Sequence, residues 1–165
     1  MKIYREELKL QSEGGCPNYF CITDKVIDIL KRSSTKNGVC VIYTHHTTCS
    51  VMIQEQSFDE CFTGQEYLNQ DLTDIFEKII PTCRREGQYL HPGPKAVEFG
   101  ARYGETKKEV INTDAHLRSA FIGRSESIVI IDGELDLGKF GHVYFADFDQ
   151  TRPRERTVQV QIMGE

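Results

Sequence analysis

The chain has 165 residues, of which 27% are charged and 39% are hydrophobic, and its formal net charge is −5 at pH 7. This length suits one domain over residues 1–165 with a substantial buried core, and the negative charge argues against a general nucleic-acid or anionic-membrane binder. No window approaches the roughly 20 apolar residues that cross a bilayer, and residues 1–10 lack the apolar core of a signal peptide, so we expect a soluble, cytoplasmic protein.

The N-terminal third of the chain places strand and helix patterns around a polar cluster. Residues 2–11 alternate loosely and predict a strand, and residues 24–32 predict a helix preceded by an N-cap threonine. The β-branched run 39–43 and the apolar run 49–53 predict two buried strands. Between them, residues 44–48 comprise two histidines and three threonines. We therefore expect polar groups to gather where these two strands end.

Helical patterns dominate the middle of the chain. The sequence Ser-Phe-Asp-Glu at 57–60 has the form of a capping box and predicts a helix over 58–79, which an internal glycine weakens or splits. Glycines and prolines in 84–109 predict a long loop with a short strand near 95–99, and loops of this length are often functional. Residues 115–122 then predict a short helix that a glycine ends.

The C-terminal part of the chain is mostly β in pattern. Buried runs at 127–131 and 143–148 and clean alternation over 157–163 predict three strands, with a turn at Asp132-Gly133 after the first. Strands and helices therefore occur in blocks rather than in strict β-α-β alternation. This order favours an α+β fold over a doubly wound sheet.

Six cysteines lie between residues 16 and 83, and no two of them form a C-x-x-C pair. A chain of this length does not need disulfides to be stable, so we expect the thiols to be reduced. The absence of C-x-x-C pairs also weakens the case for a cysteine-based zinc site.

Three of the five histidines are the strongest candidates for chemistry. His46, His91 and His116 each lie at an element boundary or in a polar loop, and three converging imidazoles with an open fourth position would suit a catalytic metal ion. Their spacing matches no established ligand pattern, so ordinary loop histidines are the alternative. We expect His45 and His142 to be structural, since adjacent strand residues such as His45 and His46 face opposite sides.

Polar residues beside His46 have two interpretations each. Glu55 ends the second central strand, where it is either a solvated charge near a helix N-terminus or a general acid/base that orients an imidazole. Thr47 and Thr48 either hydrogen-bond an anion or satisfy turn amides. Both interpretations remain open from the residues alone.

One dense basic run, residues 152–156, lies near the C-terminus. It contains Arg154, and such runs are usually solvated strand entrances. Together with Arg118, which follows His116 on the short helix, it could instead clamp a phosphate or diphosphate. The residues by themselves therefore predict an α+β domain with a histidine-lined site for an anionic ligand.

Several motifs in fixed order resemble the YjbQ family, known as secondary thiamine-phosphate synthase. The family signature H-T-[ST] with a carboxylate nine positions after the histidine is matched by His46-Thr47-Thr48 and Glu55. A second signature, A-H-[IL]-[KR], is matched by residues 115–118, and P-R-x-R by residues 153–156. The resemblance covers nearly the whole chain. One departure is that Phe-Gly at 140–141 stands where relatives tend to carry Trp-Gln.

The resemblance implies a compact α+β fold, with a mixed or antiparallel β-sandwich or barrel-like core and a few helices packed outside. It also implies a homotrimer and a polar site on His46, His91 and His116 that holds a divalent metal, zinc or magnesium, or an anion. The implied activity joins a pyrimidine diphosphate to a thiazole phosphate with release of diphosphate. Within the family that activity is secondary, and the true substrate can differ.

Under this hypothesis His46, His91 and His116 surround the diphosphate or its metal, and Arg118 and Arg154 neutralise the departing charge. His46, His116 and Glu55 are then catalytic, and Thr47 and Thr48 bind substrate. Two other functions stay open. The same site could belong to a metal-dependent hydrolase, or to a non-catalytic trimeric module that binds a phosphorylated metabolite.

Overall fold

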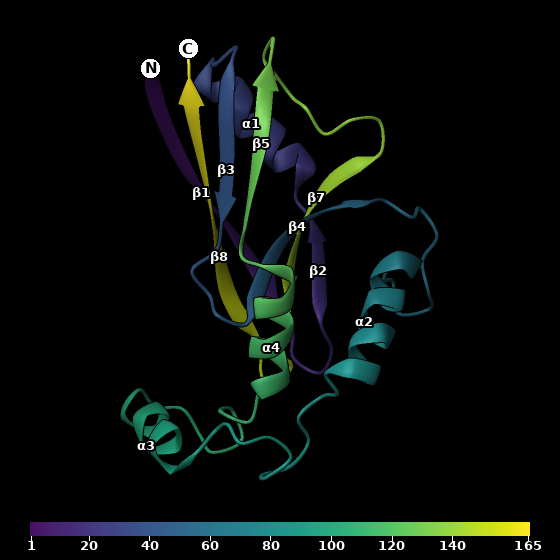
Figure 1. The fold of residues 1–165 in the computed structure, drawn as a ribbon, viewed down its shortest axis with the longest axis vertical. Helices are drawn as coiled ribbons and strands as arrows, with labels where there is room; N and C mark the ends of the chain where they lie inside the picture. Colours follow the sequence, from purple (N-terminus) through teal and green to yellow (C-terminus); the bar gives the residue numbers. More distant parts are fainter.

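Eight strands form two antiparallel sheets in the computed structural model, which describes residues 1–165 (Figure 1). The larger sheet has the order β1-β8-β3-β5-β6, with bounds Lys2–Ser12, Arg154–Gly164, Gly38–Tyr43, Ser125–Ile131 and Glu134–Leu135. The smaller sheet has the order β2-β7-β4, with bounds Asn18–Cys21, Gly141–Asp147 and Cys49–Glu55. The two sheets face each other over a common core, which confirms the predicted α+β fold with a sandwich-like centre.

Strand alternation explains which side chains reach this core. On β8, Val158, Val160 and Ile162 are fully buried, whereas Gln159 and Gln161 between them stay partly exposed. Because successive strand residues face opposite sides, one face of the five-stranded sheet is apolar and points inward. The inner faces of both sheets meet in one cluster of 16 buried residues. The predicted strands at 2–11, 39–43, 49–53, 127–131, 143–148 and 157–163 all correspond to observed strands.

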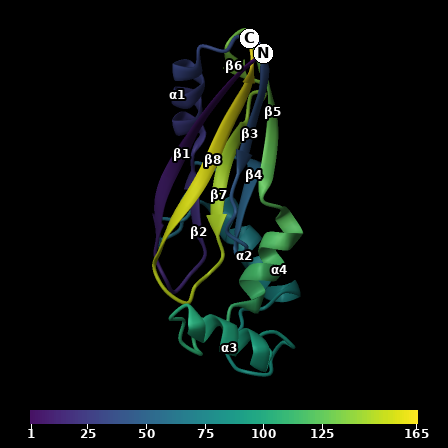
Figure 2. The same ribbon diagram turned by 90° about the vertical axis from the view of Figure 1, so that its left-hand side faces the viewer.

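The helix α1 (Thr23–Ser33) covers one edge of this core, as Figure 2 shows from the side. Its residues Val26, Ile29 and Leu30 are buried at the i, i+3, i+4 spacing of a helix face. The helix ends at Ser34, which adopts a left-handed conformation with φ 59°. The predicted helix over 24–32 is therefore confirmed.

Two further helices, α2 (Tyr67–Ile79) and α4 (Thr113–Ile122), pack outside the smaller sheet. Phe76 of α2 meets Phe148 edge-to-face, with ring centroids 5.6 Å apart, in a second buried cluster. Ser119 of α4 donates from its hydroxyl to the carbonyl of Cys49 at 2.6 Å, which fixes α4 against the start of β4. The predicted helix over 115–122, ended by a glycine, agrees with α4 and Gly123.

The capping box at 57–60 does not form, so the prediction of a helix from residue 58 is wrong. The Ser57 hydroxyl donates to the Asp59 carbonyl, Phe58 has a positive φ of 61°, and Glu60 forms a bridge with Glu66 instead. Phe62, which lies within the predicted helix, is fully exposed. The capping-box pattern does not start a helix here because this stretch has no buried surface to pack against. Helical structure begins only at residue 67.

The predicted short strand near 95–99 is also wrong, because the segment forms helix α3 (Pro94–Arg102). Proline is favoured in the first turn of a helix, where its missing N–H has no partner in any case. Figures 1 and 2 show α3 at the end of the molecule opposite both termini. Of its residues only Gly100 is buried.

All six cysteines are free in the structure. Cys40 and Cys49 are fully buried in the common core, as their apolar sequence context indicates, whereas Cys61 is only partly covered. No helix combines the length and apolar character required to span a bilayer.

Candidate functional site

A cleft of about 440 Å³ lies where the start of β8, the loop before β4, α4 and α3 come together. Fifteen residues line it, and only three of them are hydrophobic. Its polar lining consists of His45, His46, Thr47, Thr48, His91, Gly100, Glu105, Asn112, His116, Asp149, Arg154 and Arg156. The three candidate histidines, 46, 91 and 116, thus reach one cavity although 70 positions separate the first from the last.

His46 lies in the loop before β4 and is held by the backbone of β8. The amide N–H of Thr157 donates to its Nε2 at 3.0 Å, so the neutral ring carries its proton on Nδ1. Burial, followed by the charge of Arg156, lowers the pKa of His46 to about 4. His46 is therefore a neutral hydrogen-bond donor in the cleft at pH 7.

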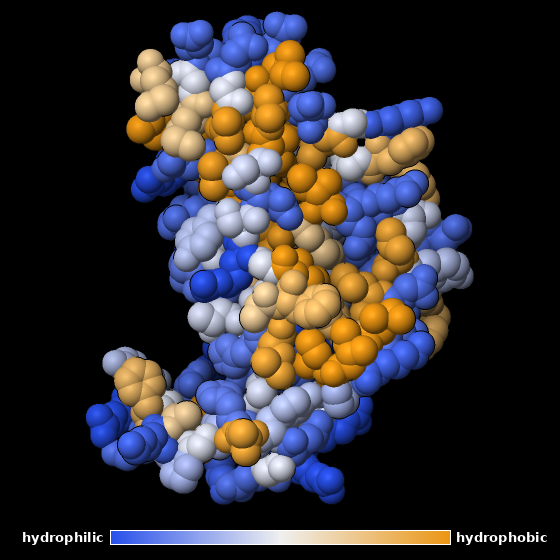
Figure 3. Space-filling view, viewed as in Figure 1, coloured by the Kyte–Doolittle hydropathy of each residue, from blue (hydrophilic) through white to orange (hydrophobic).

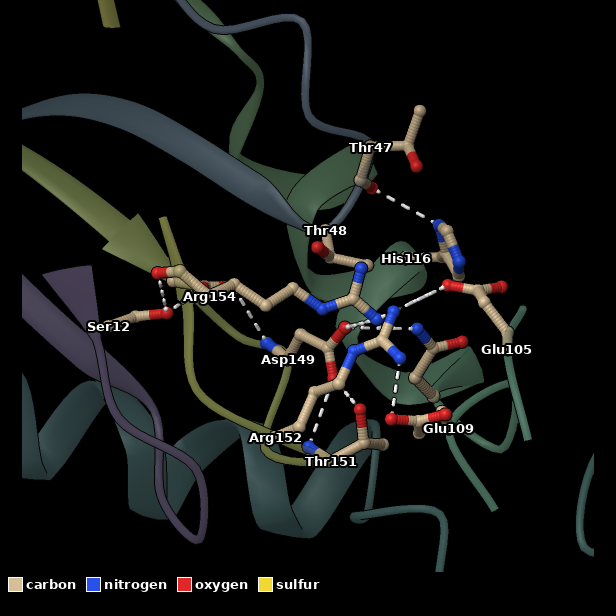
Figure 4. A network of polar contacts seen from close by, with 12 residues as sticks. Ser12, Thr47, Thr48, Glu105, Glu109, His116, Asp149, Thr151, Arg152 and Arg154 are labelled. Atoms are coloured by element: carbon tan, nitrogen blue, oxygen red, sulfur yellow. Dashed lines mark hydrogen bonds and ion pairs between the residues drawn. The ribbon is translucent and has the colours of Figure 1, made fainter. Parts of the chain in front are cut away.

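His116 projects from the first half of α4 toward the same loop. Its Nδ1 faces the carbonyl oxygen of Thr47 at 3.2 Å, and since a carbonyl only accepts, Nδ1 carries the proton (Figure 4). Its Nε2 then holds a lone pair. Burial, and next the proximity of His91, lower the pKa of His116. The His91 ring lies edge-to-face with it at 5.6 Å.

His45 also lines the cleft, contrary to the expectation that it could not share a site with His46. The two rings lie 4.3 Å apart. Residues 44–46 have already left strand β3, so the alternation of a strand does not apply to them. His142 lies on β7 opposite Gln54 and does not line the cleft.

Arg156 forms the floor of the cleft. Its Nε donates to Asp147 Oδ2 at 2.6 Å and one terminal nitrogen to Oδ1 at 2.9 Å, and both side chains are nearly inaccessible. The same terminal nitrogen donates to the Thr48 hydroxyl at 3.1 Å. This bidentate pair ties β8 to the end of β7, and it raises the pKa of Arg156 despite the opposing effect of burial.

Arg154, two positions earlier on β8, is held more loosely (Figure 4). A terminal nitrogen lies 3.1 Å from Asp149 and 3.5 Å from Glu105, and its side chain is 21% exposed. Its Nε is buried and has no hydrogen-bond partner in the protein. Buried donors nearly always have a partner, so Arg154 keeps a hydrogen-bonding capacity that the protein itself does not use.

Two of the candidate residues lie outside the cleft. Glu55 is exposed at the far end of β4, six residues or about 20 Å beyond Cys49 at the cleft end of that strand. Arg118 is two positions after His116 on α4, and two helical positions differ by about 200°, so it faces away. It is completely buried and donates to Glu77 and to the Ile80 carbonyl, both at 2.8 Å.

Thr47 and Thr48 both line the cleft, but in different ways. Thr47 is exposed and presents its carbonyl to His116, whereas the hydroxyl of Thr48 is buried against Arg156. Among the residues that the sequence analysis missed, Asp147 and Asp149 had a detectable signal, since alternate carboxylates end a buried strand just before the basic run. Glu105 had no such signal in the sequence, because its position depends on how the segment around α3 folds.

The donors do not form a ready metal site. No group of three or more His, Cys, Asp or Glu side chains is arranged to hold a metal ion. His46 Nε2 is occupied by a backbone N–H, which leaves His91 and His116, with rings 5.6 Å apart, as the other two of the three candidate imidazoles. The arrangement as it stands suits hydrogen bonding to an oxyanion better than coordination of zinc.

Comparisons with known proteins agree with this fold over the whole chain. The family model described as UPF0047 protein YjbQ-like matches residues 6–165. A UPF0047 protein of Methanothermobacter thermautotrophicus is 26% identical over 164 residues, covering 99% of this chain and 94% of the relative. One from Methanocaldococcus jannaschii is 30% identical over 144 residues, covering 87% and 83% respectively.

Solved structures show the same architecture. The crystal structure of an uncharacterized conserved protein of the yjbq/upf0047 family from Clostridium acetobutylicum has a TM-score of 0.70 and 25% identity. The match covers 94% of this chain and 99% of that chain. A hypothetical protein from Aeropyrum pernix has a TM-score of 0.68 at 24% identity, covering 97% and 99%. The chain therefore belongs to the YjbQ family, also designated UPF0047.

Proposed function

We propose that the cleft binds a phosphorylated small molecule and that the chain joins a pyrimidine diphosphate to a thiazole phosphate. The observation that carries the proposal is Arg154, whose cationic side chain lines the cleft with one buried N–H free of any partner. Phosphate oxygens are the acceptors that arginine binds best, through parallel hydrogen bonds from its planar fork. The low pKa of His46 keeps its ring neutral at pH 7, and its Nδ1–H is a second donor near Arg154.

The proposed reaction makes one main demand on the protein. The thiazole nitrogen gives its electron pair to the methylene carbon of the pyrimidine, and the bond from that carbon to the diphosphate oxygen breaks. That electron pair leaves with the diphosphate, and no proton has to be removed from the attacking nitrogen. Stabilising the negative charge on the departing group is therefore the chief catalytic task.

The cleft residues can divide this task. Arg154 takes the place next to the departing diphosphate, and the Nδ1–H of His46 donates a second hydrogen bond. The free Nε2 of His116 accepts from an N–H or O–H of the ligand. Glu55 and Arg118 have no part in this mechanism, because one lies at the far end of β4 and the other is enclosed by α2 and α4.

The proposal is tested by incubating the protein with the pyrimidine diphosphate and the thiazole phosphate and measuring thiamine phosphate and diphosphate release. We expect turnover by the native chain and at least about a hundredfold loss in Arg154→Ala, as for other donors that stabilise developing charge. Arg32→Ala removes an equal charge from the ion pair between Arg32 of α1 and Glu6 of β1, neither of which lines the cleft, and serves as the matched control. Equal turnover by all three proteins would contradict the assignment.

A hydrolase is the second candidate, and the lone pair on His116 Nε2 favours it, since a neutral imidazole can take a proton from water. A divalent ion, zinc or magnesium, could bind at His91 and His116 if a further donor moved toward them. Hydrolysis of phosphate esters by zinc- or magnesium-loaded protein, without a thiazole acceptor, would support this candidate. Tight binding of both substrates without turnover would instead support a non-catalytic module.

We also propose that the protein assembles as a homotrimer through the outer face of its larger sheet. The strand register aligns Ile3, Met163, Val39 and Val129 in one row across four strands, on the side away from the core. Three of them are clearly exposed, at 59%, 37% and 52% for the isoleucine and the two valines. Figure 3 shows hydrophobic side chains gathered over β3 and β5 on this face.

An apolar row of this kind is characteristic of surfaces that associate. Light scattering of the native chain should give three times the monomer mass, and Val129→Glu should shift it toward the monomer. A monomeric native protein would contradict the proposal.

A further inference from the structure

Glu105 places a carboxylate where the proposed function expects a ligand oxyanion. Its Oε1 lies 3.0 Å from a terminal nitrogen of Arg152 and 3.5 Å from one of Arg154. Its side chain is 28% exposed, and it lines the cleft together with Arg154 (Figure 4). Arg154 is thus paired with two internal anions, the buried Asp149 at 3.1 Å and the more exposed Glu105 at 3.5 Å.

The turn after α3 is shaped to hold this carboxylate. The N–H of Glu105 donates to the carbonyl of Gly100 at 3.0 Å, and Gly104 between them has a positive φ of 79°. A Cβ at residue 100 would lie 3.1 Å from Glu105 Oε2 and 2.7 Å from Val110. The Glu105 carboxylate therefore lies against the backbone of Gly100, in space that any larger side chain at residue 100 would occupy.

The segment that carries Glu105 is joined to the sheets mainly by charge. Arg152 on the strand side pairs with both Glu105 and Glu109, the latter at 2.5 Å. The apolar contribution is small, because Phe99 and Tyr103 at the same end are 58% and 74% exposed. Partly exposed ion pairs contribute about 1 kcal/mol or less each, so exchange of Glu105 for a stronger anion is energetically accessible.

We propose that Glu105 is a resident counter-ion of Arg154, and that a phosphorylated ligand binds by replacing it. Replacement is favourable only when the incoming group carries more negative charge than the single carboxylate of Glu105. The exchange therefore selects diphosphate and phosphate dianions over carboxylates and other singly charged anions. This inference rests on the proposed function.

The test is calorimetric titration of inorganic diphosphate into the native chain, Glu105→Gln and Glu98→Gln, at one ionic strength. Glutamine keeps the shape of Glu105 but not its charge, so we expect about five- to tenfold tighter binding than in the native chain. Glu98 lies on α3, 67% exposed, and pairs only with Arg102. Its variant removes the same charge without freeing Arg154, so we expect its affinity to stay within about twofold of native.

The outcomes separate this inference from the proposed function. Native binding that Glu105→Gln fails to strengthen beyond Glu98→Gln overturns the counter-ion role and leaves the anion site intact. Binding by Glu105→Gln alone supports the role, and shows that the native carboxylate blocks the site. No binding by any of the three proteins overturns both. Matching melting temperatures for the three proteins verify that each is folded.

Discussion

Arg154 and Arg156 point to the same side of β8 and line the same cleft, yet they are held in opposite ways. The Arg156 side chain is 4% exposed and makes two short bonds to a buried carboxylate. The Arg154 side chain is 21% exposed, shares two carboxylates at 3.1 and 3.5 Å, and leaves its Nε unpaired. We call Arg156, Asp147 and His46 the cleft floor, and Arg154 with the α3 segment the cleft mouth.

From these contacts we infer that the cleft floor sets the shape of the cleft and that the cleft mouth contacts a ligand. A buried, fully bonded pair is costly to break and offers no free donor, so the floor fixes the geometry. The pair of Arg154 with Glu105 is partly exposed on both sides and 3.5 Å long, so it can exchange partners at low cost. Four substitutions test whether the two parts of the cleft differ in this way.

The largest effect is expected at the floor. Arg156→Ala leaves Asp147 buried without its cation, which should lower the free energy of unfolding by about 3 to 5 kcal/mol. Urea denaturation followed by circular dichroism measures this change. A loss below about 1 kcal/mol would mean that the ion pair of the cleft floor contributes no more to stability than those of the cleft mouth.

His46 should make the floor sensitive to pH. The unfolded imidazole takes up a proton below about 6.5, whereas the folded one does so only near 4, so the unfolded state binds more protons over this interval. Stability should therefore fall as the pH falls from 6.5 toward 4, by about 1 to 2 kcal/mol after allowance for partial exposure. Comparing urea midpoints at pH 7.5 and 5 for the native chain and His46→Gln measures the histidine's share. An identical pH dependence in both proteins would show that His46 does not cause the loss of stability at low pH.

Arg154 should behave oppositely to Arg156. Arg154→Ala removes a partly exposed pair with Glu105 and one pair with the buried Asp149. Asp149 keeps Asn112 and Thr151 as partners, so we expect a stability loss of about 1 kcal/mol in the same urea experiment. Diphosphate affinity should nevertheless fall more than about tenfold, because the cation and its free N–H are both removed. If stability fell as far as in Arg156→Ala, the distinction between floor and mouth would not hold.

The smallest effect is expected on α3. Phe99 is 58% exposed, so Phe99→Ser should change the free energy of unfolding by about 0.5 kcal/mol or less. A strand at 95–99 with its phenylalanine in the core would lose several times more. The same urea titration therefore also checks the helical assignment of this segment.

Most of the fold was predictable because its strands carry strong local patterns. Alternation on β8 and β-branched runs on β3 and β5 identify the sheet faces without reference to tertiary structure. The capping box at 57–60 and the strand at 95–99 failed because both patterns are short and neither segment packs against the core. A weak local preference does not decide the structure where no buried surface reinforces it.

The candidate site was predictable only in part. The histidines and Arg154 stood out because polar residues at strand and helix ends are conspicuous in sequence. Arg118 lies outside the cleft because the two positions that separate it from His116 turn its side chain by about 200° around α4. The tertiary pairing of Arg154 with Glu105 joins residues 49 positions apart, and no local pattern reports it.

The most direct test of the anion site follows the arginine side chains themselves. In a nitrogen-proton NMR spectrum of the native chain, the Nε–H signals of Arg154 and Arg156 can be followed as inorganic diphosphate is added. We expect the Arg154 signal to move as diphosphate binds beside its guanidinium group, while that of Arg156, already bonded to Asp147 at 2.6 Å, stays in place. An Arg154 signal that does not move at saturating diphosphate would contradict the account.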